Sequence, residues 1–145
     1  MIGLLQRVSA ASVAVGGREI AAIGRGALVL VGVQKNDGPA QAGRLLERLL
    51  SYRVFPDEAG RMNRSVRDIE GGLLLVPQFT LAADTRTGTR AGFSTAAEPE
   101  RARALFEALV REARAAWPHT CAGEFGADMQ VSLTNDGPVT FWLES

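Results

Sequence analysis

Cysteine and histidine are almost absent from this chain, which has one of each. The single cysteine, Cys121, excludes a disulfide within the chain and suits a reducing compartment. His119 would have to serve any Ser-His-Asp triad, and no Gly-x-Ser-x-Gly elbow accompanies it. Zinc sites in proteins take three or four protein ligands, so these two neighbouring residues are expected to belong to a surface loop. We therefore expect no metal site.

The sequence also lacks a nucleotide-binding loop and a long apolar run. There is no P-loop and no dinucleotide fingerprint, because Gly16-Gly17 lies in the context of a hairpin. The longest apolar run, residues 27–33, is too short to span a bilayer, and no signal-peptide pattern opens the chain. We expect a cytoplasmic protein with no cofactor and no membrane association.

Neither sign of charge dominates, since 16 basic and 16 acidic residues give a net charge of zero. This balance argues against binding of nucleic acid by bulk electrostatics, although it permits local contacts with a few phosphates. All basic residues except Lys35 are arginine, the better planar fork for phosphate, but a codon bias towards arginine is the simpler explanation. No spacing favours a pair of catalytic carboxylates. Catalysis would then depend on main-chain N–H groups, hydroxyls and groups of the substrate.

What the chain does have is the pattern of one strand-rich domain over residues 1–145, of which 46% are hydrophobic. Gly16-Gly17 is expected to form a hairpin turn, and Asn135 to Pro138 is the strongest turn signal near the end of the chain. The expected strands cover residues 4–8, 12–15, 19–23, 26–33, 73–76, 129–133 and 139–143.

Two amphipathic helices are expected between these strands. The first follows Asp37, a candidate N-cap, with Pro39 in its first turn and leucines at helical spacing. The second begins at Pro99 and ends just after Trp117, because Pro118 terminates it. The predicted fold class is α+β: a mixed, twisted, barrel-like sheet with two main helices packed on one face.

Two short motifs carry a resemblance to a known family. Residues 77–81, Pro-Gln-Phe-Thr-Leu, are similar to the Ser-Gln-Phe-Thr-Leu motif of D-aminoacyl-tRNA deacylases. Residues 135–140, Asn-Asp-Gly-Pro-Val-Thr, resemble the Asn-x-Gly-Pro-x-Thr motif of the same family. The similarity extends over essentially the whole chain. It implies a homodimeric hydrolase that cleaves the ester between a D-amino acid and the terminal adenosine of aminoacylated tRNA.

The resemblance also implies how the D-amino acid is chosen. In that family the Gly-Pro peptide is cis and reaches into the pocket of the neighbouring subunit, where its carbonyls hold the α-amino group and leave no space for an L side chain. Carried over, Gly137 and Pro138 select chirality and Arg7 braces them. To exclude an L side chain, this wall of the pocket has to be rigid. Glycine has no side chain to exclude, so cleavage of glycyl-tRNA is expected as well.

The first motif would supply the catalytic groups. By resemblance, Gln78, Phe79 and Thr80 line the adenosine pocket, and main-chain N–H groups lie near the scissile carbonyl, where they stabilise an oxyanion. Thr80 is either a nucleophile or an orienting group. The 2′-hydroxyl of the terminal ribose would activate water in place of a protein base, and Met129 would pack against the adenine.

The chain departs from the family pattern at two places. Pro77 stands where serine is usual, which removes a main-chain N–H and a hydroxyl and fixes φ. Proline also occurs there in a sister group of deacylases with looser chirality, so Pro77 bears on the range of substrates. The loop after the motif, with Arg90-Ala91-Gly92-Phe93, lacks the usual Pro-Ser. This loop is expected to face the acceptor end of tRNA, with Arg86 and Arg90 as candidate contacts.

Two alternative hypotheses stand beside the deacylase. One is a non-catalytic nucleic-acid-binding homodimer on the same scaffold, motivated by Pro77 and the arginine-rich loop. The other is a structural or small-ligand protein whose motifs are vestigial. In that case Phe79 and Met129 are core residues, Arg7 is a rim charge, and Gly137-Pro138 is a plain hairpin corner.

Overall fold

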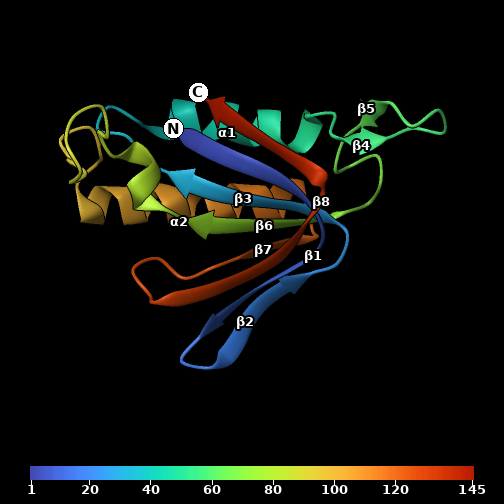
Figure 1. Ribbon diagram of the computed structural model, residues 1–145, viewed down its shortest axis with the longest axis horizontal. Helices are drawn as coiled ribbons and strands as arrows, with labels where there is room; N and C mark the ends of the chain where they lie inside the picture. Colours follow the sequence, from blue (N-terminus) through green and yellow to red (C-terminus); the bar gives the residue numbers. More distant parts are fainter.

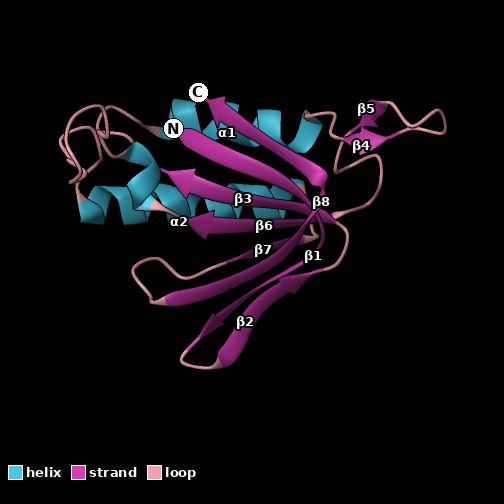
Figure 2. Ribbon diagram, in the orientation of Figure 1, coloured by secondary structure: helices cyan, strands magenta, loops and turns pink.

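A mixed β-sheet with two helices on one face forms the body of the protein in the computed structural model, which describes residues 1–145 (Figures 1 and 2). Neither helix has the length and hydropathy that a crossing of a membrane needs. The elements are β1 (Ile2–Val15), β2 (Arg18–Ile23), β3 (Gly26–Gly32), α1 (Pro39–Ser51), β4 (Phe55–Pro56), β5 (Met62–Arg64), β6 (Gly72–Pro77), the 3₁₀ turn η1 (Phe79–Ala82), α2 (Pro99–Ala116), β7 (Thr120–Ala122) and β8 (Met129–Glu144).

Strand β1 organises the sheet because it pairs with three other strands. Leu5 in its first half is opposite Val29 of β3 and Phe141 of β8, whereas Val13 in its second half is opposite Ala21 of β2 and Val131 of β8. Strands β2 and β3 thus follow one another along the same edge of β1, and the sheet curls between them towards a barrel. The pairs β3–β6 and β6–β7 are parallel, which makes the sheet mixed as predicted.

Both faces of the central strands are buried, which explains their continuous apolar sequences. Val29 of β3 packs in the larger cluster, together with the helix residues Leu45, Leu49 and Leu109. Leu28, the neighbour of Val29, packs in a smaller cluster that the curled end of the sheet encloses. The predicted helical spacing is confirmed, since the buried residues of both helices lie on the face towards the sheet.

The prediction of two separate strands at residues 4–8 and 12–15 was wrong, because β1 runs unbroken from Ile2 to Val15. The two predicted strands at residues 129–133 and 139–143 also belong to one element, β8. The turn signal between them does not make a hairpin. Both segments pair with β1, and the intervening residues form a bulge in β8, since Val8 is opposite Asn135 while Gln6 is opposite Thr140.

The N-cap of α1 is Gly38 and not Asp37 as expected. The Asp37 carboxylate accepts hydrogen bonds from the Met1 amine and from Gln34 N, both at 2.6 Å. Because the Met1 amine is fully buried, its charge needs a partner of opposite charge. The Asp37 carboxylate fills this role and does not cap the helix. The predicted start of α2 at Pro99 is confirmed, and the polar segment 55–69 contains the small β4–β5 hairpin.

Candidate active site

A cleft of about 470 Å³ opens at the carboxyl end of β6. Pro77, Gln78 and Phe79 line one side of it, and Met129 lines it from the start of β8. We call it the β6 cleft. The cleft therefore gathers three of the residues that the sequence predicts for the adenosine pocket, Gln78, Phe79 and Met129, together with Pro77. Its walls are mainly apolar, which suits a flat ring of a ligand.

The motif residues reach the cleft because β6 ends at Pro77, which has no N–H to continue the sheet. Gln78 N still donates to Val31 O at 2.7 Å, and the chain then turns sharply through η1. Gln78 Nε2 donates to Thr80 Oγ1 at 2.5 Å, so the amide fixes the hydroxyl oxygen. Thr80 is exposed beside the cleft and is not one of the residues that line it.

The cleft includes a residue that the sequence analysis did not select. Phe125, between β7 and β8, lines it beside Met129. The motifs gave no indication of this residue, because it lies in a segment with no regular structure.

An aromatic pair stands next to the cleft. The rings of Phe79 and Phe93 lie with their centroids 5.2 Å apart, and the two residues are 59% and 45% exposed. In the sequence, Phe93 belongs to a loop rich in threonine, glycine and arginine, and it was not predicted as a site residue. An aromatic residue among threonines, glycines and arginines was the available signal.

The loop after η1 holds the two arginines predicted to contact tRNA, and the structure treats them differently. Arg86 donates to both carboxylate oxygens of Asp84, at 2.9 and 2.7 Å. These hydrogen bonds hold the pKa of the Asp84 carboxyl well below its usual range and raise the pKa of Arg86. Arg90 is exposed and forms no ion pair. Arg90 is therefore the freer of the two cations.

Residues 136–139 protrude from β8 as the bulge described above, and we call them the Gly-Pro corner. Gly137 has φ +126°, a region that favours glycine, and its peptide bond to Pro138 is cis. Asn135 Nδ2 donates to Thr140 Oγ1 at 2.8 Å, and Val139 N donates to Asn135 Oδ1 at 3.0 Å. The polar motif residues therefore tie the base of the corner together.

Arg7 lies directly against the Gly-Pro corner, as the resemblance implies. Its Nε donates to Asp136 O at 3.0 Å, and its Nη1 donates to Val54 O at 2.7 Å. A Cβ added to Gly137 would lie 2.8 Å from Arg7 Nη2, so the guanidinium fills the space where a side chain would be.

Within one chain the corner and the β6 cleft are far apart. Arg7 is opposite Ala27 near the start of β3, whereas Pro77 is opposite Val31 near its end. Four residues of strand separate these positions, or about 13 Å along the sheet. Figure 1 shows the bend of β8 at the opposite end of β3 and β6 from η1. The predicted site residues thus form two groups.

No group of three or more His, Cys, Asp or Glu side chains is placed where it could hold a metal ion. His119 packs edge-on against Trp117, and Cys121 Sγ lies 3.7 Å from Ala22 O. These two residues are thus engaged with different neighbours.

Comparison with known proteins gives the family. The model of the family described as D-Tyr-tRNA(Tyr) deacylase matches residues 4–144. The chain belongs to this family. The predicted resemblance is therefore confirmed, and with it the prediction of an enzyme.

Several members of the deacylase family are close to this chain in sequence. A D-aminoacyl-tRNA deacylase of Alkalilimnicola ehrlichii is 66% identical, covering 100% of this chain and 97% of its own length. A D-aminoacyl-tRNA deacylase of Pseudomonas aeruginosa is 60% identical over the full length of both.

Two solved structures share the fold. The c-Myc DNA Unwinding Element Binding Protein is 39% identical with a TM-score of 0.95, covering 100% of this chain and 99% of its own. A probable eukaryotic D-amino acid tRNA deacylase, at 16% identity and a TM-score of 0.87, covers 99% of this chain and 98% of its own and shows the fold alone. The predicted α+β, barrel-like class is confirmed.

Proposed function

We propose that this protein hydrolyses the ester bond of D-aminoacyl-tRNA, releasing a free D-amino acid and tRNA. The observation that carries the proposal is the β6 cleft, where residues of the first motif meet Met129 of β8 in a chain that is 66% identical to a named deacylase. A cytoplasmic location is part of this proposal, because aminoacylated tRNA is the substrate.

The cleft is shaped for the terminal adenosine. Met129 and Phe125 offer apolar surfaces to the adenine, and Gln78 supplies a polar group on the side of η1. The first N–H groups of a helical turn have no acceptor within that turn, and here they belong to Phe79 and Thr80. Directed at the scissile carbonyl, such donors stabilise the oxyanion, each by roughly 3 kcal/mol.

The activation of water is assigned to the substrate. No histidine, cysteine or acidic side chain lines the β6 cleft, so the protein offers no base there. The 2′-hydroxyl of the terminal ribose is adjacent to the ester and orients the water that attacks the carbonyl carbon. The bond from that carbon to the ribose oxygen then breaks, and this oxygen takes up the proton that the water loses. Removing the 2′-hydroxyl is therefore expected to slow cleavage greatly.

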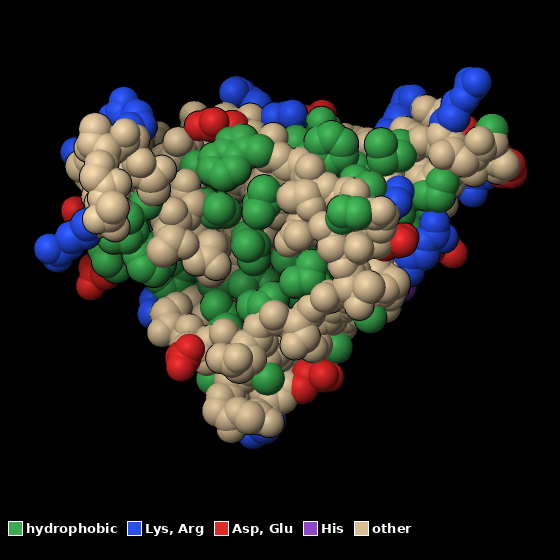
Figure 3. All heavy atoms as spheres, in the orientation of Figure 1, with side chains coloured by type: hydrophobic (Ala, Val, Ile, Leu, Met, Phe, Trp, Pro, Cys, Tyr) green, Lys and Arg blue, Asp and Glu red, His purple; other side chains and the backbone are tan.

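Chirality is selected by a second copy of the chain. The Gly-Pro corner lies about 13 Å along the sheet from the cleft of its own chain, which supports a site whose corner comes from a partner chain. Hydrophobic side chains gather over the middle of the sheet face that the helices leave open (Figure 3). Trp142 of β8 is 52% exposed and belongs to this face, because the neighbouring Leu143 packs towards the helices. We assign this face to a homodimer interface.

The deciding experiment compares esters that differ in handedness. Purified protein is incubated with D-tyrosyl-, L-tyrosyl- and glycyl-tRNA, and release of the amino acid is followed. We expect the D and glycyl esters to be cleaved and the L ester to persist. Equal rates for D and L, or rates no higher than without protein, would reject the proposal. Comparing the L rate of the wild type with that of Pro77→Ser measures whether Pro77 relaxes selection.

A second candidate is binding of nucleic acid without turnover, on the same homodimer. It is favoured by the relative at 39% identity, whose name refers to binding of a DNA unwinding element. Binding of tRNA that weakens with salt, with no cleavage of any ester, would support it instead.

A further inference from the structure

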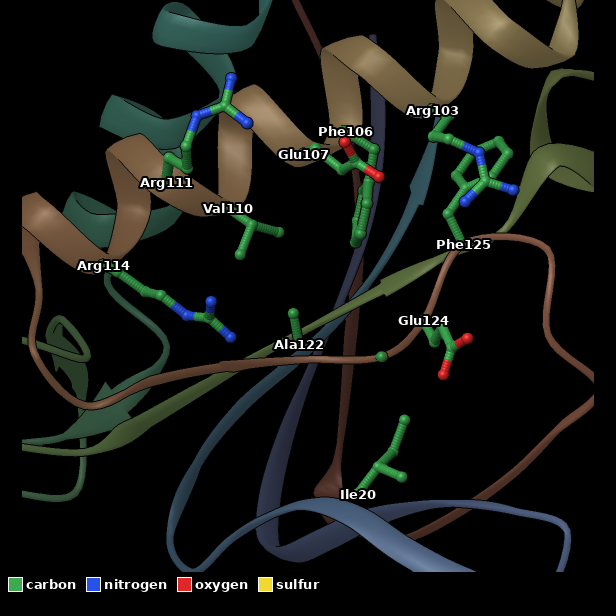
Figure 4. A pocket seen from close by; sticks show the side chains of 11 residues that line it. Ile20, Arg103, Phe106, Glu107, Val110, Arg111, Arg114, Ala122, Glu124 and Phe125 are labelled. Carbon is green, nitrogen blue, oxygen red and sulfur yellow. The ribbon is translucent and has the colours of Figure 1, made fainter.

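A second hollow, of about 400 Å³, lies between α2, the segment after β7 and the tip of β2 (Figure 4). We call it the arginine hollow. Arg103 and Arg114 of α2 line it from above, and Ile20 of β2 lines it from below. In Figure 4 the Arg114 side chain extends into the hollow and Arg103 lies beside Phe125, while the Arg111 guanidinium points away.

The two guanidinium groups have no acidic partner. The protein contains four ion pairs, and none of them includes a residue of this hollow. Arg103 is held in place by Phe125, with its guanidinium carbon 5.0 Å from the ring centroid. Stacking on an aromatic face leaves the N–H edge of a guanidinium free to bind an anion.

The arginine hollow adjoins the β6 cleft. Phe125 lines both of them, and on α2 Ala102 lines the cleft while the next residue, Arg103, lines the hollow. From Arg103 to Arg114 the helix rises by about 16 Å. One strand of a nucleic acid carries several phosphates over such a length.

We propose that the arginine hollow binds phosphodiester groups of the RNA strand whose terminal nucleotide occupies the β6 cleft. The inference rests on the proposed function for the position of that nucleotide. Arg103 contacts the phosphate nearest the cleft, and Arg114 contacts one further along the strand. Guanidinium groups suit this role because they form paired hydrogen bonds to phosphate oxygens.

Two carboxylates limit where the strand can lie. Glu107 and Glu124 also line the hollow, and neither is within ion-pair distance of an arginine. Glu107 is four residues after Arg103 on the same helix, so its charge weakens phosphate binding there. Glu107→Gln is therefore expected to tighten the binding of RNA, a gain that misfolding cannot produce.

The test uses uncharged tRNA as the probe and measures its Kd over a series of salt concentrations. The double variant Arg103→Gln/Arg114→Gln is compared with the double variant Arg44→Gln/Arg67→Gln. Arg44 and Arg67 are also exposed, but they line neither cavity. We expect the first variant to raise Kd roughly tenfold and to flatten the slope of log Kd against log salt by about 1.4, or about 0.7 for each contact. The second is expected to change Kd less than twofold. Equal effects of the two variants, or no gain from Glu107→Gln, would overturn the inference.

A small substrate separates this inference from the proposed function. The D-tyrosyl ester of adenosine occupies the β6 cleft but carries no phosphodiester, so Arg103→Gln with Arg114→Gln is expected to leave its hydrolysis unchanged. Slower hydrolysis in that variant would show that the arginines serve the cleft itself. If the wild-type protein cleaves neither D-tyrosyl-tRNA nor the D-tyrosyl ester of adenosine, the proposed function fails. The comparison of Kd values then still decides whether the arginine hollow binds RNA.

Discussion

At the scale of single residues, the surroundings of Thr80 bear on the chemistry that this hydroxyl can perform. Its Oγ1 accepts a hydrogen bond from Gln78 Nε2, and no histidine or carboxylate lines the neighbouring cleft to take its proton. A nucleophilic hydroxyl needs such a base. The contacts therefore favour an orienting role over a nucleophilic one.

Replacing Thr80 distinguishes the two roles. For an orienting hydroxyl, Thr80→Ala is expected to lower kcat by roughly 10- to 100-fold, because about 1.5–3 kcal/mol of hydrogen bonding is lost. Thr80→Ser, which keeps the hydroxyl, is the control and should retain most of the activity. Single-turnover kinetics on D-tyrosyl-tRNA provides the measurement. A complete loss with alanine together with a trapped acyl-enzyme in the wild type would instead make Thr80 the nucleophile, and an unchanged rate would remove it from the chemistry.

Gly137 is the residue most restricted by its own backbone. Its φ of +126° disfavours any side chain, and an added Cβ would lie 2.8 Å from Arg7 Nη2. We expect Gly137→Ala to destabilise the protein by roughly 1–3 kcal/mol and to move the corner enough to lower the rate on D-tyrosyl-tRNA at least tenfold. Urea denaturation and the deacylation assay measure the two effects.

A glycine in an unrestricted position provides the control for this substitution. Gly43 lies in α1, its φ is not positive, and an added Cβ would meet nothing within 4 Å. Gly43→Ala is expected to stabilise the protein by up to about 1 kcal/mol, since alanine is the better helix former. If Gly137→Ala behaved like Gly43→Ala, the corner would not be held as tightly as its contacts indicate.

At the scale of elements, the close approach of the segment after β7 to the start of β8 sets the floor of the β6 cleft. Gly123 N donates to Leu75 O at 2.8 Å, which fixes the segment against the sheet. A Cβ on Gly123 would lie 2.8 Å from Met129 Sδ and 3.5 Å from Pro77 Cδ. Gly123 thus leaves room for the methionine side chain behind the cleft.

Gly123→Ala is accordingly expected to push the Met129 thioether into the cleft. Because adenine is bound there in both ground and transition states, KM for D-tyrosyl-tRNA should rise several-fold while kcat changes little. A second substitution, Met129→Ala, removes the clash, so Gly123→Ala should raise KM less in the Met129→Ala background than in the wild type. A fall in kcat with constant KM, or an equal rise of KM in both backgrounds, would mean that Gly123 does not act on the cleft through Met129.

The elements also show what the sequence could and could not predict. Both helices were predicted well, because leucines at helical spacing indicate a helix with one apolar face that packs on a sheet. The Gly-Pro corner was predicted as a turn between two strands and is a bulge within one strand, since residues 135–138 carry the same local signal in both. Only the pairing of Val8 and Gln6 with β8 distinguishes them, and that pairing depends on residues about 130 positions away.

The candidate site divides in the same way. Gln78, Phe79 and Met129 were found because they lie in or near recognisable motifs, and they do line one cleft. Phe93 and Phe125 were not selected, because each reaches the site from a segment whose position is set by tertiary contacts alone. The N-cap of α1 was mispredicted for a related reason, since the Asp37 carboxylate binds the Met1 amine, which is 36 positions away in the sequence.

At the scale of the whole molecule, the two groups of predicted site residues lie at opposite ends of β3. One end has the β6 cleft with the turn η1, and the other has the Gly-Pro corner clamped by Arg7. A twofold-symmetric dimer places the same surface of each chain against the other, so each cleft can receive the partner's corner. In the proposed dimer, each of the two sites combines the cleft of one chain with the corner of the other.

Mixing two variants with strongly reduced activity tests this division of the site. A chain with Thr80→Ala keeps its corner, and a chain with Gly137→Ala keeps its cleft. When equal amounts are unfolded together and refolded, half of the dimers are expected to be mixed, and each mixed dimer has one intact site. The mixture should therefore regain about a quarter of the wild-type rate on D-tyrosyl-tRNA, as symmetric pairing predicts. The two variants refolded separately and then assayed together provide the baseline, because their subunits have not exchanged. A mixture no more active than this baseline would mean that each chain uses its own corner, and that the distance between corner and cleft in a single chain does not require a partner.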